Sequence, residues 1–238
     1  MHALHKVLQA FASPQSFRLA MPDVWAGFQV NIKLMFTAEA LVLVLALAVA
    51  IARGLPGRAA APLRAAMILY TDVFRGTPLI LVAFLVGFGL PGLQLRVISS
   101  QSTFVYGVIA LTLVYTAYVT EVYRAGIESV HPSQRAAARS LGLNYFQALR
   151  YVVVPQAVRR VIPPLLNDFI GLQKDTALIT VIGVAEAAQQ AQNFSNTYYN
   201  FTSYVVAAVF FIFLTIPLAR FTDHLIALRE RKERAAAI

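Results

Sequence analysis

The stretch Glu121–Pro155, EVYRAGIESVHPSQRAAARSLGLNYFQALRYVVVP, decides the fold of this chain. It is largely polar and lies between stretches that are apolar enough to cross a bilayer. Pro132 fits the first turn of a short helix, and Gly142 stands where a left-handed residue would end that helix. Asn144 and Gln147 have the spacing of a capping box at the start of a second short helix. The sequence therefore predicts a compact knuckle of two short helices joined at a glycine corner.

The composition places the chain in a membrane. Of its 238 residues, 58% are hydrophobic and 13% are charged, whereas charged residues make up about a quarter of soluble domains. The net charge of +9 comes from basic residues in short segments between apolar runs, where they orient helices, so we expect no nucleic-acid binding. The absence of cysteine excludes disulfides and thiolate metal sites.

A single all-α membrane domain, residues 1–238, is predicted. A spanning helix needs about 20 mostly apolar residues, and the stretch 157–173 is the weakest candidate because it contains Pro163, Pro164 and Asp168. Because five is an odd number of crossings, the two termini are expected on opposite sides of the membrane. The predicted spans are 34–52, 76–95, 97–120, 157–173 and 201–219.

Two shorter segments are predicted to be helical or apolar without crossing the membrane. Residues 64–74 suit a helix along the cytoplasmic interface, with Thr77 as the N-cap and Pro78 as the first residue of the following span. The alternative is a single kinked helix. Ala177–Ala185 is apolar but too short to cross alone, so we expect it to pack inside the bundle.

The distribution of basic residues sets the orientation. Arginines concentrate in the first connection (53–75), in the insert 121–160 and in the tail 220–234. Because segments rich in Lys and Arg stay in the cytoplasm, the insert and the C-terminus are predicted to be cytoplasmic. The N-terminus is predicted to lie outside.

The first helix of the knuckle suits close contact with a partner. Ala136, Ala137 and Ala138 give it almost no side-chain bulk, and Arg135 and Arg139, four residues apart, line one side. From these properties alone, an ordinary cytoplasmic loop with an amphipathic helix explains the segment equally well.

The loop resembles the coupling loop of permease subunits of ABC importers. The family pattern is EAA, three residues, Gly, nine residues, then aliphatic-x-aliphatic-Pro. The chain departs from it at Ala136, where the family usually has Glu, and at Ser133, where Gly commonly precedes Gln134. The matching residues are Ala137, Ala138, Gly142, Val152, Val154 and Pro155.

The resemblance extends beyond the loop to the polar amino acid uptake subfamily. It is carried by Phe74–Leu79, Glu121–Ile127, Pro155–Ala157, Pro163 with Asn167, and Lys174–Leu178. It implies the type I ABC importer permease fold in a bacterial inner membrane, and ATP-driven uptake of a polar or charged amino acid or a related small solute. It also implies that the ATPase contacts lie at Gln134, Arg135, Ala136, Ala137, Ala138, Leu141 and Gly142.

The implied partners are a dimer of ABC ATPase subunits, a second permease subunit that is the same or a different chain, an extracytoplasmic solute-binding protein, and membrane lipid. ATP and Mg would be bound by the ATPase, because the sequence contains no G-x-x-x-x-G-K-[ST] loop. No nucleophile, acid–base pair or metal-ligand cluster is recognisable. We therefore expect no enzymatic chemistry, cofactor or metal in this chain.

Charged residues inside predicted spans suggest a solute pathway, because such residues usually face the bundle interior or a cavity. Glu39 and Asp168 either contact the solute or pair with another helix or subunit. A rival interpretation is an ion-coupled secondary carrier or channel that uses these two carboxylates, but such carriers commonly show internal repeats and none is visible. The predicted pathway residues are Glu39, Asn167, Asp168, Lys174, Asp175 and Thr176.

Overall fold

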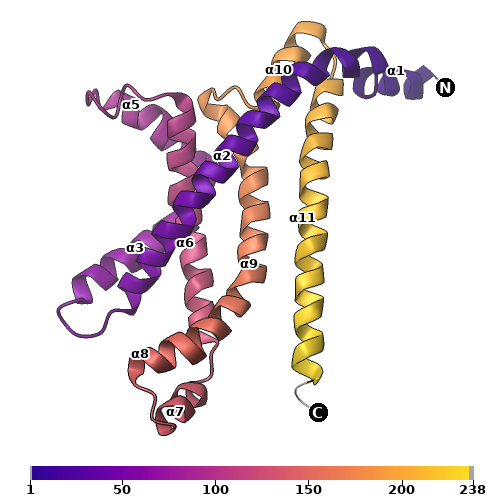
Figure 1. Ribbon diagram of the computed structural model, residues 1–238. Helices are drawn as coiled ribbons and strands as arrows, with labels where there is room; N and C mark the ends of the chain where they lie inside the picture. The colour runs from indigo at the N-terminus through magenta and orange to yellow at the C-terminus, as the bar shows by residue number, and fades with distance from the viewer. Residues whose placement is uncertain (1, 236–238) are drawn as a thin grey trace.

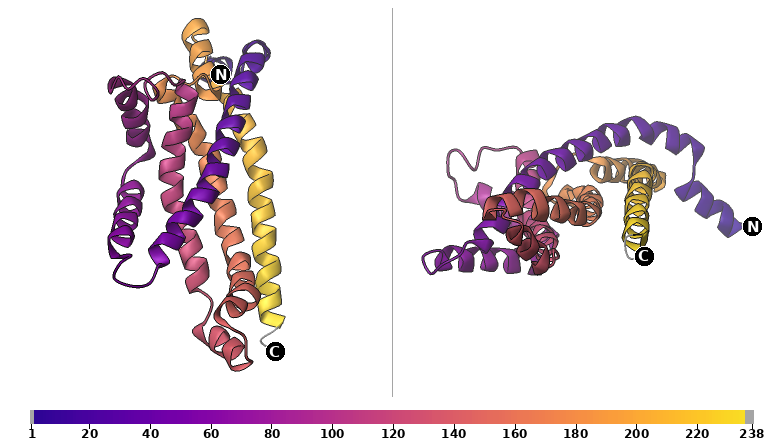
Figure 2. Two further views of the ribbon diagram at one scale, coloured as in Figure 1. Left: turned by 60° about the vertical axis from the view of Figure 1, so that its left-hand side comes forward. Right: turned by 60° about the horizontal axis from the view of Figure 1, so that its bottom comes forward.

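The computed structural model describes residues 2–235, which form helices and turns without a strand. Four long helices build the bundle, and α6, α9 and α11 lie side by side while α2 crosses them (Figures 1 and 2). Residues 131–148, which we call the knuckle, lie at the end of the bundle opposite α1 and α10 (Figure 1). The long helices are α2 (Pro14–Gly54), α6 (Thr103–Glu128), α9 (Val154–Asp175) and α11 (Thr202–Ala235).

Helix α2 is much longer than the predicted span 34–52. It begins after Ser13, whose hydroxyl accepts a hydrogen bond from the N–H of Ser16 at 3.3 Å, and Pro14 occupies the first turn. Its 41 residues extend over about 60 Å, roughly twice the thickness of the hydrocarbon core. The helix therefore continues past the predicted span, toward α1 (His2–Phe11).

The helical part of the predicted span 76–95 is shorter than predicted and is set at a sharp angle to the helix before it. Helix α3 (Ala61–Gly76) is followed by a second helical segment made of α4 (Leu79–Phe84), the π-turn η1 (Leu85–Gly89) and α5 (Leu90–Gly92). The two segments meet at a bend of 107°. The second segment extends about 20 Å at 1.5 Å per residue, which is too short to cross a bilayer alone.

The break at Thr77 and Pro78 was predicted, but the capping roles were wrong. The hydroxyl of Thr77 donates back to the carbonyl of Val73 at 2.8 Å, so Thr77 closes α3 instead of capping the next helix. Pro78 is the N-cap residue of α4, and Leu79 is its first helical residue. The back-bond to the residue four positions earlier is a common alternative use of a threonine hydroxyl.

The predicted span 97–120 begins before the first residue of the observed helix and ends before its last residue. Residues 97–101 form turns that are held by polar side chains: Gln101 Nε2 donates to the carbonyl of Val97 at 2.8 Å, and the Tyr106 hydroxyl donates to that of Ile98 at 2.7 Å. Helix α6 begins only at Thr103, after an extended Ser102, and it continues to Glu128.

The short apolar segment after α9 packs inside the bundle, as predicted. It forms the 3₁₀ helix η3 (Thr176–Ile182), which contacts α4, α6 and α9. Glycines on the neighbouring elements permit this close approach. A Cβ at Gly107 would lie 2.6 Å from Ile179 Cγ2, and one at Gly87 would lie 2.5 Å from Ile182 Cγ2.

The apolar core has two main parts. The larger is formed by α2, α4, α6 and η3, with Leu34, Leu111 and Ile179 fully buried. The smaller joins the first half of α2 to α10 (Ala187–Tyr198) and α11, around Phe28 and Phe194. Between them the two clusters fix α10 and η3 against the long helices.

Candidate functional site

The knuckle is closed by local hydrogen bonds of the predicted kind. Helix α7 (Pro132–Ser140) ends with the N–H of Gly142 donating to the carbonyl of Arg139 at 3.0 Å and the N–H of Leu143 donating to that of Ala138 at 3.2 Å. These two bonds form a Schellman motif, which needs a left-handed residue, and Gly142 supplies it with φ +87°. The glycine corner is therefore confirmed.

The capping box is also confirmed. The side-chain oxygen of Asn144 accepts from the N–H of Gln147 at 2.9 Å, and the Gln147 side-chain oxygen accepts from the N–H of Asn144 at 2.9 Å. This pair starts α8 (Tyr145–Ala148), which continues through the π-turn η2 (Leu149–Val153) into α9. Helices α8 and α9 are thus parts of one continuous helical path, and α7 joins it through the corner at Gly142.

The three alanines of α7 do not share one environment. Ala138 is buried, whereas Ala136 and Ala137 are exposed. Leu141 stands at the tip with 84% of its surface exposed. Of the seven predicted ATPase-contact residues, six are exposed on the surface: Gln134, Arg135, Ala136, Ala137, Leu141 and Gly142.

Two large side chains beside the tip were missed by the sequence reasoning. Phe146 is 77% exposed and Tyr145 is 50% exposed, both on α8. Aromatic residues in an otherwise polar insert were the signal that would have found them, since exposed aromatic side chains are enriched where proteins bind one another. The knuckle therefore exposes three large apolar or aromatic side chains: Leu141 at its corner, and Tyr145 and Phe146 on α8.

A cluster of charges ties three helices together at the knuckle end of the bundle. Glu121 of α6 pairs with Arg124 at 3.6 Å and also forms an ion pair with Arg53 of α2. The Arg53 guanidinium donates in addition to the hydroxyl of Thr71 on α3 at 2.8 Å. Arg75 lies 3.9 Å from the same carboxylate of Glu121. The cluster fixes the relative positions of α2, α3 and α6.

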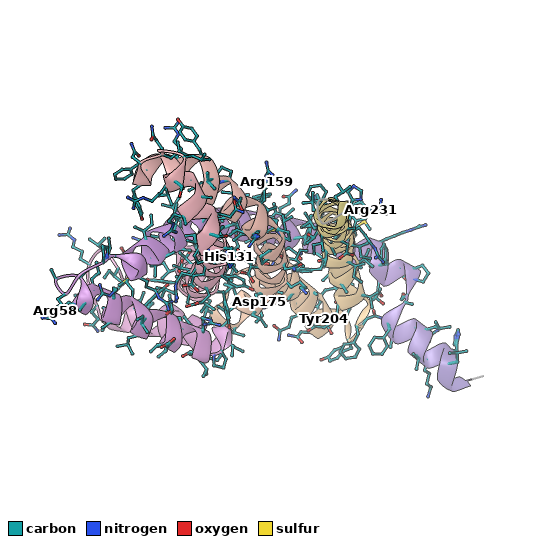
Figure 3. The ribbon with its side chains drawn as sticks, turned by 90° about the horizontal axis from the view of Figure 1, so that it is seen from below. Arg58, His131, Arg159, Asp175, Tyr204 and Arg231 are labelled. Atoms are coloured by element: carbon teal, nitrogen blue, oxygen red, sulfur yellow. The ribbon has the colours of Figure 1, made fainter. Side chains whose placement is uncertain are left out.

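Three of the predicted pathway residues come together between α2, α6 and α9. Glu39 and Asp168 are near enough for their charges to interact, and each has a buried carboxylate oxygen without a hydrogen-bond partner among residues 2–235. Asp175 accepts a hydrogen bond from the Tyr115 hydroxyl at 2.8 Å. Seen from the knuckle end, Asp175 lies near the middle of the molecule, close in projection to His131 (Figure 3).

A cavity of ≈ 520 Å³ leads from Asp168 toward the knuckle end. Arg75, Glu121 and Arg160 line it on the side of the charge cluster, and Tyr118 and Pro164 are among its other walls. Its volume lies in the range of small-molecule sites. Asp168 is thus a predicted pathway carboxylate that lines a cavity.

The other predicted pathway residues do not join this cluster. Asn167 and Lys174 are exposed on α9. The Thr176 hydroxyl accepts instead from Asn31 Nδ2 at 3.0 Å, within a separate polar cluster toward the other end of the bundle. Asn167, Lys174 and Thr176 are adjacent to Asp168 or Asp175 in sequence, but successive residues of a helix point in different directions, so adjacency did not place them in the same cluster.

Glu186 is the centre of that separate cluster and was missed by the sequence reasoning. Its fully buried carboxylate accepts from Asn31 Nδ2 at 2.9 Å and from the N–H groups of Ala188 and Gln189 at the start of α10. Asn31 in turn accepts from the N–H of Ala187 at 3.0 Å. Each of these polar groups has a hydrogen-bond partner within the cluster, so the cluster has a structural role and connects α2 to α10.

A helix bundle whose outer surface is apolar and whose interior carries partly buried carboxylates has the architecture of a membrane transport subunit. Residues 56–230 match the family described as "Binding-protein-dependent transport system inner membrane component". Because the match covers more than half of the chain, this protein belongs to that family. It is a multi-pass membrane protein and a subunit of an ABC transporter complex.

Named relatives agree with this assignment. The chain is 39% identical over 159 residues to "Probable glutamine ABC transporter permease protein GlnM" of Bacillus subtilis, covering 66% of this chain and 72% of the relative. It is 30% identical over 204 residues to "Arginine transport system permease protein ArtQ" of the same organism, covering 84% and 89%. The prediction of an ABC permease subunit is thereby confirmed over that of a secondary carrier.

Solved structures show the same fold. The chain matches "Crystal structure of an amino acid ABC transporter with histidines" with a TM-score of 0.78 and 32% identity, covering 89% of this chain and 94% of the other. It also matches the MetNI methionine ABC transporter with a TM-score of 0.71 and 18% identity, covering 86% and 95%, which concerns the fold alone. The predicted type I importer permease fold is confirmed.

Proposed function

We propose that this chain forms half of the translocation pathway of an ATP-driven importer for a polar or charged amino acid or a related small solute. The glutamine and arginine permeases among its relatives support this substrate class. The observation that carries the proposal is the knuckle: it is exposed, it is closed by its own hydrogen bonds, and its helix α8 runs on into α9, the helix on which Asp168 lines a cavity.

The proposed partners act from both sides of the membrane. A dimer of ABC ATPase subunits binds ATP and Mg and holds the knuckle through Ala136, Ala137 and the tip residue Leu141. A second permease subunit, identical or different, completes the pathway, and an extracytoplasmic solute-binding protein delivers the solute. In this arrangement the chain itself performs no enzymatic step and needs no cofactor.

The proposed orientation has the knuckle and the C-terminus in the cytoplasm and the N-terminus outside a bacterial inner membrane. It is supported by the concentration of arginines at the knuckle end, where Arg53, Arg75 and Arg124 surround Glu121. Under this orientation the cavity beside Asp168 opens toward the cytoplasm and serves as the exit for the solute.

Within the pathway, Asp168 is proposed to receive the positively charged group of the solute, with Glu39 close behind it. An ionised carboxylate at membrane depth is costly unless it has a partner, and each of these two has one buried oxygen with no hydrogen-bond donor among the described residues. Asp175 has the Tyr115 hydroxyl as a donor, so its role is to hold α9 against α6.

The test is solute uptake by vesicles that contain the chain, its second permease subunit, its ATPase and its solute-binding protein. We expect uptake of a polar amino acid from a panel that includes glutamine and arginine, only when ATP is supplied on the ATPase side. A matched preparation with a hydrolysis-inactive ATPase is the control. Uptake driven by a proton or sodium gradient without nucleotide would contradict the proposal.

A further inference from the structure

The N-terminal helix α1 carries an apolar stripe that is exposed in the described structure. The stripe residues are spaced at i, i+3, i+4 and i+7, which places them on one face of a helix. Lys6 is two positions from both Leu4 and Leu8, so at 3.6 residues per turn it lies on the opposite face. The stripe consists of Leu4, Val7, Leu8 and Phe11, which are 66%, 53%, 52% and 48% exposed.

This helix is held in a fixed position against the start of α11. The N–H of Phe201 donates to the carbonyl of Ala10 at 2.9 Å, and Asn200 Nδ2 donates to that of Gln9 at 2.9 Å. The rings of Phe11 and Phe201 stack with centroids 5.4 Å apart. Since these contacts fix the end of α1 nearest the bundle, its direction is part of the fold.

The direction of α1 differs from that of the spanning helices. In Figure 1 α1 runs across the upper end of α11 and away from the bundle, whereas α11 runs down the length of the molecule. The right-hand view of Figure 2 shows α1 projecting beyond the other helices. A helix with this direction is suited to lie along the surface of a membrane that α11 crosses.

We propose that α1 is an interfacial anchor that lies on the bilayer surface at the end opposite the knuckle. Its stripe would enter the acyl-chain boundary while Lys6 faces water and lipid headgroups, which is how amphipathic helices bind membranes. The helix that follows α1 in the sequence and the helix at the contact with Phe201 also expose apolar side chains, among them Leu19 of α2 and Val205 and Val209 of α11. Lipid is therefore the favoured occupant, and a second copy of the chain is the alternative that the experiment separates.

Because the chain has no cysteine, single labels report cleanly on each face of α1. The experiment uses Leu4→Cys and Leu8→Cys on the stripe and Lys6→Cys as the matched control, each carrying a nitroxide label. The full chain is reconstituted with its partner subunits in phosphatidylethanolamine–phosphatidylglycerol vesicles. Collision rates are measured with oxygen, which concentrates in lipid, and with a water-soluble nickel chelate.

The expected result is a ratio of oxygen to nickel collisions several-fold higher at positions 4 and 8 than at position 6. Equal access of the nickel chelate to all three positions would place α1 in water and overturn the proposal. Exclusion of both reagents from positions 4 and 8, with spin–spin broadening between labelled copies, would assign the stripe to a second subunit and also overturn it. Neither readout depends on transport activity or on the identity of the solute.

Discussion

The N–H of Leu143 donates to the carbonyl oxygen of Ala138 at 3.2 Å, and this bond closes the helix that we propose as the ATPase contact. This bond spans five residues, and it requires a left-handed backbone conformation at Gly142, the residue before Leu143. Leu141 is thereby held outward at the corner. The geometry of the tip thus depends on a single glycine.

Gly142→Ala is expected to uncouple the transporter while leaving it folded. A Cβ in the left-handed region costs about 1–2 kcal/mol, which is enough to loosen the end of α7, and nothing within 4 Å of Gly142 would clash. We expect solute-stimulated ATP hydrolysis by the complex to fall several-fold. Gly57→Ala is the matched control, because Gly57 has φ +88° and is equally open but lies outside the knuckle. Equal losses in the two variants would contradict the role of the knuckle.

Ala137→Trp is expected to block docking of the ATPase. Ala137 is exposed on α7, so the large ring is tolerated in the free subunit but prevents close approach of a partner. The dissociation constant of the ATPase, measured in detergent or nanodiscs, should rise roughly tenfold or more, which corresponds to about 1.4 kcal/mol of lost binding energy. Ala59→Trp in the exposed α2–α3 connection should leave binding unchanged. Unaltered affinity of the Ala137 variant would exclude this face of α7 from the interface.

The features that sequence predicted well are local. The capping box of Asn144 and Gln147 and the glycine corner involve residues a few positions apart, so their spacing is visible in the sequence. The packing of the segment after α9 was predictable from its length, because a short apolar segment at membrane depth must be enclosed by protein.

The features that sequence missed depend on distant neighbours. Asn31 and Glu186 are separated by 155 positions, and Arg53 and Glu121 by 68, so nothing in their local sequence identifies them as partners. The start of α6 was misplaced for a different reason. Apolar residues before Ser102 extend the hydropathy signal, while polar side chains fold the backbone there into turns.

Asp168→Asn is expected to impair uptake without impairing assembly. The substitution removes the negative charge that we propose for the positive group of the solute but keeps the size of the side chain. Uptake should fall by roughly tenfold or more, since charge-assisted hydrogen bonds are worth about 1.5–3 kcal/mol, while ATPase binding stays normal. Asp223→Asn, on an exposed part of α11 where Asp223 pairs with Arg220 at 3.6 Å, is the control. Full uptake by the Asp168 variant would leave this carboxylate with a helix-packing role.

The contact between Gly126 and Val161 joins α6 to the helix that continues into the knuckle. A Cβ at Gly126 would lie 2.0 Å from Val161 Cγ2, whereas the next neighbour, the carbonyl oxygen of Ala157, would be 3.5 Å away. The steric conflict is therefore confined to one methyl group. This explains why a glycine is needed at this position, which lies in the segment Glu121–Ile127 that marked the family resemblance.

A double substitution tests this explanation. Gly126→Ala alone should destabilise the subunit by about 1–3 kcal/mol through overpacking, and Val161→Ala alone should destabilise it through the cavity that it leaves. Together they should cost less than the sum, because the new methyl group occupies the space of the one removed, with a coupling of about 0.5–3 kcal/mol. The measurement is denaturant-induced unfolding in detergent micelles, with Gly89→Ala, where nothing lies within 4 Å, as the control. Additive losses would show that the added methyl group and the Val161 side chain do not compete for the same space, and the explanation of Gly126 by its contact with α9 would then be wrong.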